Sequence, residues 1–387
     1  MNWSNRISPV VNQVAPSGLR KFFDIAATME NVISLGVGEP DFATPKHIID
    51  ACVTSLQAGQ TSYTSNSGLP ELRQEIANHI SSCCQVDYDP ENQIIVTVGV
   101  SEALDLAIRT IVAPGDEVLI PEPCYVAYQA CVTFAGGVPV PIATNPSRGF
   151  CVTAEELEEK ITTKTKAIIL GYPNNPTGAI MPQAELSRIA ALVEKHDLLV
   201  ISDELYSELT YEGSHVCFAA LPGMKDRTIL LNGFSKSHAM TGLRIGYALG
   251  NEDFIGAMVK IHQYTMLCAP VTAQIAALEA LKNGYKEMRK MIDQYNVRRQ
   301  LMYKGLTEMG LSCFEPQGAF YIFPSIQKTG LSSQEFCERL LQEERLAVIP
   351  GDAFGACGEG FIRCSYSYST EHLQEALNRL ERFVSRF

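Results

Sequence analysis

The segment from Phe234 to Tyr247 holds the side chains in this chain that are best suited to chemistry. Lys236 lies between two serines, and Arg244 follows in a turn flanked by glycines. A lysine amine can form a Schiff base when burial and neighbouring cations lower its pKa toward neutrality. A guanidinium nearby could hold a phosphate group. Taken alone, the segment is equally compatible with a surface loop that carries a basic residue at each end.

Asp203 and Tyr206 offer a second pair of useful groups, directly after an apolar run at 198–202. A carboxylate there could keep a pyridine nitrogen protonated, which turns the ring into a strong electron sink. The phenol could donate a hydrogen bond to a ring oxygen. An Asp-Glu pair at the end of a strand is also typical of a helix cap, so this pair does not by itself distinguish a cofactor site from a cap.

Three further positions could contribute to the same site. Ser101 and the backbone around Val100 follow an apolar run and open a helical pattern, where N–H groups bind phosphate or where serine simply caps the helix. Asn175 lies in an Asn-Pro-Thr-Gly turn, and Tyr125 could stack on a ring. An ordinary turn and a half-buried aromatic are the alternatives for the last two.

The elements that must position these residues are short apolar runs that alternate with helical patterns. Runs rich in β-branched residues, with few polar residues between them, predict strands of a parallel sheet that is covered by helices on both faces. Ligands of such sheets bind beyond the carboxyl ends of the strands. The runs lie at residues 94–98, 117–121, 166–170, 198–202, 228–232 and 245–249.

A second unit follows. Residues 272–309 form a long helical pattern without proline, and strands are predicted at 319–323, 346–349 and 361–366. We therefore expect an α/β fold with two domains and a ligand cleft between them. The large domain, with a mostly parallel sheet flanked by helices, spans 46–278. The smaller α+β domain combines 1–45 with 279–387.

Composition limits the classes of function. A formal net charge of -12 argues against nucleic acid as the main ligand. The chain has no run of eighteen apolar residues and no apolar signal-peptide core near its start, so we expect no membrane association. The twelve cysteines include one adjacent pair, Cys83-Cys84, and no Cys-x-x-Cys. This pattern predicts buried thiols in a reducing cytoplasm, without disulfides and without a metal site.

The order of the motifs strongly resembles the class I/II aminotransferases of pyridoxal-phosphate fold type I, along nearly the whole chain. Within that family the chain is most similar in look to prokaryotic aromatic and N-acetyl-LL-diaminopimelate aminotransferases. One motif would be weak evidence, but six occur in the family's order. They are Gly38–Phe42, Tyr172–Gly178, Ser202–Tyr206, Ser235–Tyr247, Gly318–Tyr321 and Phe361–Tyr366.

The resemblance implies pyridoxal 5'-phosphate as cofactor and assigns roles to these residues. Lys236 would form the Schiff base and move the proton between the substrate's α carbon and the cofactor. Asp203 would pair with the pyridinium nitrogen. Tyr206 and Asn175 would bind the ring oxygen, and Tyr125 would stack on the ring.

The resemblance also implies which groups bind the anions. Tyr63 would reach the phosphate from the neighbouring subunit, which implies a homodimer with shared sites. Arg363 would clamp the substrate's α-carboxylate, while Gly36 and Gly38 let the backbone approach it and Tyr125 and Asn175 also contact the substrate. Within one subunit the phosphate would be held by Ser101, the backbone around Val100, Ser235 and Arg244, and Glu102 would be a further cofactor-binding residue.

The substrates are then an amino acid and a 2-oxo acid. The motif Ser17–Asp24 resembles family members that act on aromatic or bulky amino acids, and no clear second arginine is present for a side-chain carboxylate. We therefore expect an aromatic or broad-range aminotransferase that uses 2-oxoglutarate. A role as N-acetyl-LL-diaminopimelate aminotransferase in lysine biosynthesis is the alternative.

Two other classes of function share parts of this pattern. A pyridoxal-phosphate C–S lyase would keep the cofactor site but release a keto acid without an acceptor. A regulatory protein that uses an aminotransferase-like domain as a sensor would normally carry a basic DNA-binding extension, and this acidic chain shows none.

Overall fold

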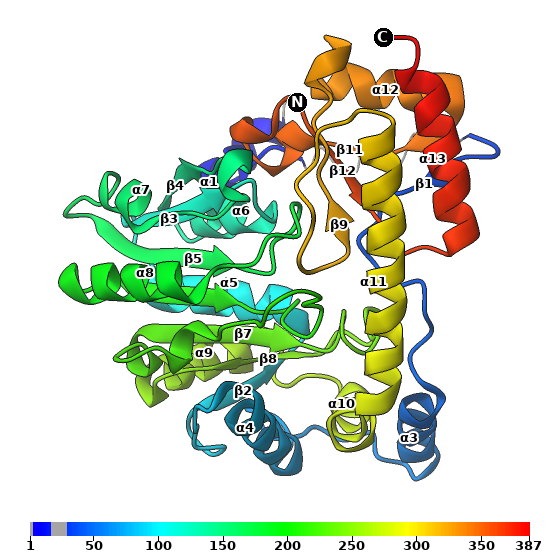
Figure 1. Ribbon diagram of the computed structural model, residues 1–387. Helices are drawn as coiled ribbons and strands as arrows, with labels where there is room; N and C mark the ends of the chain where they lie inside the picture. The colour runs from blue at the N-terminus through cyan, green and yellow to red at the C-terminus, as the bar shows by residue number, and fades with distance from the viewer. Residues whose placement is uncertain (1–2, 17–28) are drawn as a thin grey trace.

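A seven-stranded sheet lies at the centre of the molecule in the computed structural model, which describes residues 3–16 and 29–387 (Figure 1). The strand order is β2-β8-β7-β6-β5-β3-β4. The strands are β2 (Ile94–Thr97), β3 (Glu117–Glu122), β4 (Val138–Ala143), β5 (Thr165–Gly171), β6 (Leu199–Asp203), β7 (Thr228–Gly233) and β8 (Gly246–Leu249).

Both faces of this sheet are buried, as the apolar runs predict. Neighbouring residues of β5 point to opposite faces, because side chains alternate along a strand. Ile168 packs in the cluster that includes helix α8 (Gln183–Lys195), whereas Ile169 packs in the cluster that includes helix α5 (Gly99–Ile111). The two-sided burial explains why polar residues seldom interrupt these strands.

The structure departs from the sequence prediction at two strands. β8 was expected in a parallel sheet, but it runs antiparallel to both β2 and β7. The connection at 234–245 contains no helix, and a parallel crossover needs a longer connection that usually contains one. β4 was not predicted, because its sequence Val-Pro-Val-Pro-Ile-Ala contains two prolines. It lies at the edge of the sheet, where missing N–H donors are tolerated.

Side chains cap the start of two helices beside the sheet, α7 (Ala154–Glu158) and α9 (Glu252–Thr265). Asn251 accepts a hydrogen bond at the start of α9, and Thr153 and Glu156 form a reciprocal capping box at α7. Besides α5 and α8, the described α-helices up to residue 283 are α1 (Pro9–Asn12), α3 (Lys46–Gln57), α4 (Pro70–Cys84), α6 (Ala127–Phe134), α7 (Ala154–Glu158), α9 (Glu252–Thr265) and α10 (Val271–Asn283).

The long helical pattern at 272–309 is a pair of helices, α10 and α11 (Tyr285–Glu308), and α11 runs beside the central sheet from α10 to the C-terminal elements (Figure 1). The predicted later strands are present but short. They and the nearby helices are β9 (Tyr321–Ile322), α12 (Ser333–Glu344), β10 (Leu346–Ala347), β11 (Ile349–Pro350), β12 (Ile362–Ser365) and α13 (Thr370–Val384).

The N-terminal part of the chain packs with this C-terminal part. Strand β1 (Ile33–Ser34) pairs in parallel with β10, and a separate sheet has the order β11-β12-β9. A single apolar cluster joins Leu35 to Tyr295 on α11, Phe320 beside β9 and Phe383 on α13. The 3-10 turns are η1 (Trp3–Arg6), η2 (Pro146–Arg148), η3 (Phe218–Ala220), η4 (Lys225–Arg227), η5 (Gln327–Thr329), η6 (Gly351–Phe354) and η7 (Ala356–Gly358).

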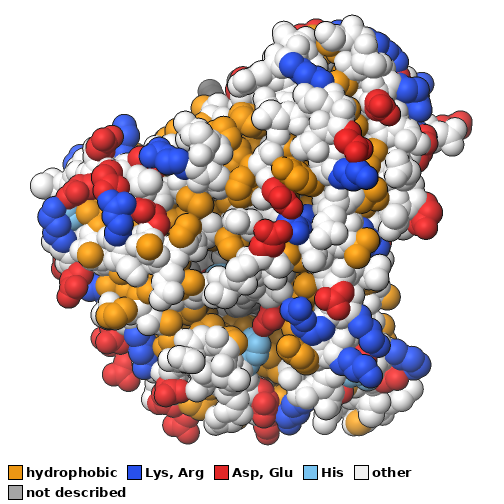
Figure 2. Space-filling view, in the orientation of Figure 1, with side chains coloured by type: hydrophobic (Ala, Val, Ile, Leu, Met, Phe, Trp, Pro, Cys, Tyr) orange, Lys and Arg blue, Asp and Glu red, His pale blue; other side chains and the backbone are white. Residues whose placement is uncertain are grey.

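On the face seen in Figure 2, acidic and basic side chains are interspersed over most of the surface, and basic side chains gather at the lower right of the view. Among the described residues, no helix is both long enough and apolar enough to cross a membrane.

Candidate active site

A cavity of about 490 Å³ lies beyond the carboxyl ends of the central strands. Its wall includes the ends of β5 and β6, the start of α5, and the segment after β7. The C-terminal part of the chain closes it from the other side. Most of the residues predicted for the site line this cavity, namely Gly36, Gly38, Val100, Ser101, Tyr125, Asn175, Asp203, Tyr206, Ser235, Lys236, Arg244 and Arg363.

Two predicted residues do not line it. The carboxylate of Glu102 points elsewhere, because one of its oxygens accepts a hydrogen bond from the N–H of Val98 and the other lies 2.7 Å from Nδ1 of the buried His262. This side chain therefore holds the turn that precedes α5 instead of facing a ligand. Tyr63 is 82% exposed and lies on the outer surface of its own chain.

Lys236 lies in the middle of the cavity wall. Its Nζ donates a hydrogen bond to the carbonyl of Gly38 over 2.7 Å. Burial lowers the pKa of this amine from its ordinary 10.5 to about 8, with help from Arg363 and Arg244 and against the carboxylate of Glu39. A lysine with that pKa is partly neutral near physiological pH, and a neutral amine is a nucleophile.

Asp203 comes from the last residue of β6 and is fixed by two donors. The hydroxyl of Tyr128 donates to its Oδ2 over 2.8 Å, and the N–H of Leu205 donates to its Oδ1 over 3.2 Å. Burial raises the pKa of Asp203, and these two hydrogen bonds oppose the rise. Among the described residues no cation pairs with this partly buried carboxylate, so it can pair with a positively charged ligand atom.

One end of the cavity is suited to an anion. Helix α5 begins at Gly99, and the preceding Val98 has no side chain that can cap it, so the first N–H groups of the helix are open to a ligand. Gly99 has a φ of +74°, and a Cβ there would come within 2.7 Å of Nη2 of Arg244. Glycine at this position therefore lets the guanidinium approach the start of the helix. Ser235, which is buried, lines the same cavity.

Arg363 on β12 forms the opposite end and is almost fully buried. Its Nη1 donates to the side-chain oxygen of Asn175 over 2.9 Å, and Nη2 donates to the carbonyl of Gly36. The guanidinium also lies over the rings of Tyr321 and Phe354. Its buried Nε has no partner within the described part of the chain. An unpaired donor of this kind is costly unless a ligand accepts from it.

A network of tyrosines completes the cavity. The hydroxyls of Tyr206 and Tyr321 lie 2.8 Å apart, and the rings of Tyr125 and Tyr128 meet edge to face. Gly38 must be glycine here, since a Cβ would come within 2.0 Å of the Tyr321 hydroxyl.

Four residues that line this cavity with polar side chains had no role predicted from the sequence: Glu39, Tyr128, Thr241 and Tyr321. Glu39, Thr241 and Tyr321 lie inside the six family motifs, so their position beside residues with predicted roles could have indicated a place in the site. For Tyr128 the sequence offers only a spacing of three residues from Tyr125, and residues about one turn apart on any helix have that spacing.

Comparisons with known proteins agree on one family. The family model described as aminotransferase class I and II matches residues 30–380. The putative aminotransferase YugH of Bacillus subtilis is 54% identical over 98% of both chains. A probable N-acetyl-LL-diaminopimelate aminotransferase of the same organism is 43% identical and covers 98% of this chain and 95% of its own.

A solved structure agrees with the fold. The aromatic aminotransferase from Pyrococcus horikoshii superposes with a TM-score of 0.91 at 42% identity, over 95% of this chain and 99% of that one. Other relatives at similar identity are described as aspartate aminotransferases. The three substrate names occur at nearly equal identity, so overall similarity does not choose among them.

Proposed function

The chain belongs to the class I and II aminotransferases, which use pyridoxal phosphate, and we propose that it takes the amino group from aromatic or a broad range of L-amino acids and passes it to 2-oxoglutarate. The distribution of cations carries the choice of donor. Among the described residues that line the cavity, the cations are Lys236, Arg244 and Arg363. Glu39 adds a negative charge to the same wall. The acceptor follows from the family resemblance alone.

The residues present fit the cofactor. The open N–H groups of α5, together with Arg244 and Ser235, would hold its phosphate, and the carboxylate of Asp203 would pair with its ring nitrogen. Tyr206 and Asn175 would hydrogen-bond the ring oxygen. When bound, pyridoxal phosphate supplies an aldehyde that attaches amines and a ring that takes up negative charge from the substrate's α carbon.

The chain's own groups would then handle the substrate. Arg363 lines the cavity and its guanidinium is already oriented by Asn175 and Gly36, so it would bind the α-carboxylate with little loss of side-chain freedom. The amine of Lys236 is the base within the cavity whose pKa of about 8 suits a proton transfer near neutrality. We propose that Lys236 would take the proton from the substrate's α carbon and deliver it to the cofactor carbon that is bonded to the transferred nitrogen.

The role in lysine biosynthesis remains as a second candidate, because a relative at 43% identity is named for N-acetyl-LL-diaminopimelate. That substrate also presents an α-amino acid end to the Arg363 clamp. The motif Ser17–Asp24, from which the choice of aromatic substrates partly came, lies outside the described residues.

A homodimer with shared sites is part of the proposal. Tyr63 is 82% exposed, and Tyr264, Met266 and Leu267 are further exposed apolar side chains. The side chain of Asn66 donates to the carbonyl of Leu267, which ties the loop that carries Tyr63 to these residues. Contact with a second subunit would cover this apolar surface and bring Tyr63 toward the partner's phosphate site.

The division into domains at 46–278 and 1–45 with 279–387 likewise stays a proposal.

Half-reactions test the donor class. The purified enzyme is mixed with one amino acid and no acceptor, and the rate of conversion of the bound cofactor is read from its absorbance. We expect phenylalanine and tyrosine to react at least tenfold faster than aspartate. A faster reaction with N-acetyl-LL-diaminopimelate would favour the second candidate, and aspartate as the fastest donor would contradict the proposal. Keto acid released from cystathionine without acceptor would indicate a lyase.

A further inference from the structure

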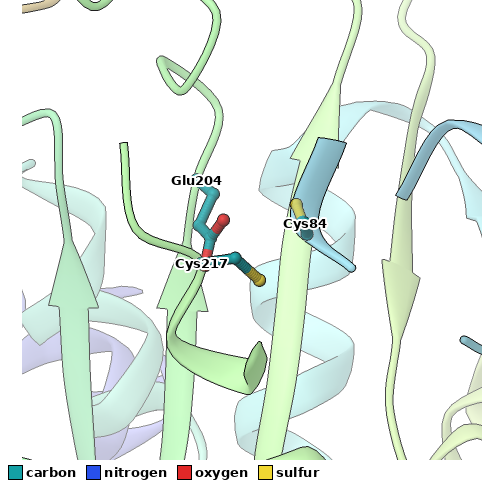
Figure 3. Close-up of side chains that lie close together, drawn as sticks. All are labelled: Cys84, Glu204 and Cys217. Carbon is teal, nitrogen blue, oxygen red and sulfur yellow. The ribbon is translucent and has the colours of Figure 1, made fainter. Parts of the chain in front are cut away.

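A cluster of metal-binding side chains lies away from the cavity. Cys84 ends helix α4, Glu204 follows β6, and Cys217 directly precedes η3 (Figure 3). One donor atom from each residue lies within 4.8 Å of the others. The sulfurs of Cys84 and Cys217 therefore lie no more than 4.8 Å apart. Three segments that are distant in sequence thus bring two sulfurs and a carboxylate to one point.

The carboxylate of Glu204 is held in place by its surroundings. Glu204 is 2% exposed and Cys217 is 4% exposed. One oxygen of Glu204 accepts hydrogen bonds from the hydroxyl of Ser202 over 2.9 Å and from the N–H of Phe218 over 3.1 Å. The other lies 2.6 Å from Nε2 of His215 and keeps a free lone pair. Outer partners of this kind fix a ligand's orientation before a metal arrives.

We propose that Cys84, Cys217 and Glu204 bind a thiophilic divalent cation, for which Zn²⁺ is the best match. Thiolate sulfur selects Zn²⁺ over hard cations such as Mg²⁺, and zinc accepts sulfur together with carboxylate oxygen in a tetrahedral set. The fourth position goes to water or to Cys83, whose Sγ lies 3.2 Å from that of Cys84. Binding displaces the thiol protons, since the ligands must be thiolates.

The arrangement favours a metal over a disulfide. Joining Cys84 to Cys217 would need an oxidant and would leave the buried carboxylate of Glu204 beside a neutral bridge. A cation instead engages the two sulfurs and the carboxylate together. The sequence contains no spacing motif that would predict this site, because its sulfurs come from separate segments. The inference therefore departs from the sequence prediction of no metal site.

The cation would join structural elements rather than take part in the reaction. Asp203 lines the active-site cavity, but the next residue, Glu204, does not. The metal would tie the end of α4 and the segment before η3 to the carboxyl end of β6. This inference does not depend on the choice of amino donor.

The test uses the tag-free, cofactor-loaded full chain in reduced form, without amino acids that chelate metals. The protein is stripped with a chelator and titrated with Co²⁺, whose long-wavelength absorption reports tetrahedral thiolate coordination, and Zn²⁺ is then added in competition. We expect about one ion per chain, displacement of Co²⁺ by Zn²⁺, and affinity at least tenfold weaker in Cys84→Ser and Cys217→Ser. Cys131→Ser, on α6, is the matched control and should bind like the wild type.

A second measurement avoids the variants, which could lose stability for other reasons. Alkylation followed by peptide mapping on the wild type should show that Zn²⁺ protects Cys84 but not Cys131, since both of these cysteines are partly exposed. Lack of stoichiometric binding by the wild type would overturn the proposal. Alkylation unchanged by Zn²⁺ would also overturn it, as would a Cys84–Cys217 disulfide in protein purified without added oxidant.

Discussion

The hydroxyl of Tyr128 lies 2.8 Å from Oδ2 of Asp203, although the first residue belongs to α6 and the second ends β6. Both side chains line the cavity. The donor fixes the rotamer of the carboxylate and favours its charged form, because a hydrogen bond to an ion stabilises that ion. Tyr128 is therefore a positioning residue for the carboxylate that would face the cofactor's ring nitrogen.

Replacing Tyr128 by phenylalanine should weaken the enzyme without unfolding it. Loss of a hydrogen bond to a charged group costs about 1.5–3 kcal/mol, so we expect kcat/KM and cofactor affinity to fall roughly tenfold to a hundredfold. The pKa of Asp203 should rise further. Tyr172→Phe removes a buried hydroxyl that donates to the carbonyl of Phe150 outside the cavity, and it should leave both quantities near wild type.

Lys236→Ala should remove turnover while the cofactor still binds. General acid–base catalysis by a placed side chain contributes about 10²- to 10⁴-fold, and loss of the attachment point adds to this. After borohydride reduction, mass spectrometry should find the cofactor's mass on Lys236 of the wild type and on no residue of the variant. Lys166→Ala, at an exposed position on β5, serves as control. A variant with full turnover would show that Lys236 is not the reactive amine.

The reactivity of Lys236 should depend on pH with a break near 8. Burial holds its pKa at about 8, so in cofactor-free enzyme the neutral fraction falls about tenfold per pH unit below that value and is nearly constant above it. Trace acetylation read by mass spectrometry follows this fraction. In Glu39→Gln the carboxylate that raises the pKa of Lys236 is gone, so the break should move to lower pH. A shift to higher pH would contradict the assigned sign.

Arg363→Lys should lower kcat/KM for amino acids by roughly a hundredfold. A lysine keeps the charge, but it cannot hold Asn175 and Gly36 and still offer a second donor in the plane of a carboxylate. The loss should appear with every donor, because all share the α-carboxylate. Arg109→Lys, at a half-exposed ion pair on α5, controls for the substitution itself. A loss limited to one donor would instead place Arg363 at the substrate's side chain.

Mixed dimers test the role of Tyr63. Tyr63→Ala and Lys236→Ala subunits are each expected to be weakly active or inactive. If Tyr63 serves the partner's site, a heterodimer of the two variants contains one intact site and one site with both defects. Mixing should then restore up to half of the wild-type activity per heterodimer. Absence of any gain, with heterodimers verified by mass spectrometry, would mean that Tyr63 acts within its own chain or not at all.

Much of the fold could be predicted, because local sequence encodes it. The apolar runs at 94–98, 117–121 and 166–170 have no polar alternation, and each became a strand buried on both faces. The edge strand β4 was missed because its sequence contains two prolines. The antiparallel direction of β8 could not be predicted, because residue types do not specify the path of the connection before it. Side-chain chemistry likewise indicated which residues could serve a cofactor, through their types and motif order.

The sequence by itself determined most of the strands, the order of the motifs and the family, since all of these depend on residues close together along the chain. Only the tertiary structure decided which distant side chains meet. It brought Arg363 to Asn175, Tyr128 to Asp203, and Cys84 to Cys217. It also turned Glu102 away from the cavity and toward His262. Such contacts depend on the path of the chain and on the direction of each side chain, which hydrophobic periodicity and spacing do not contain.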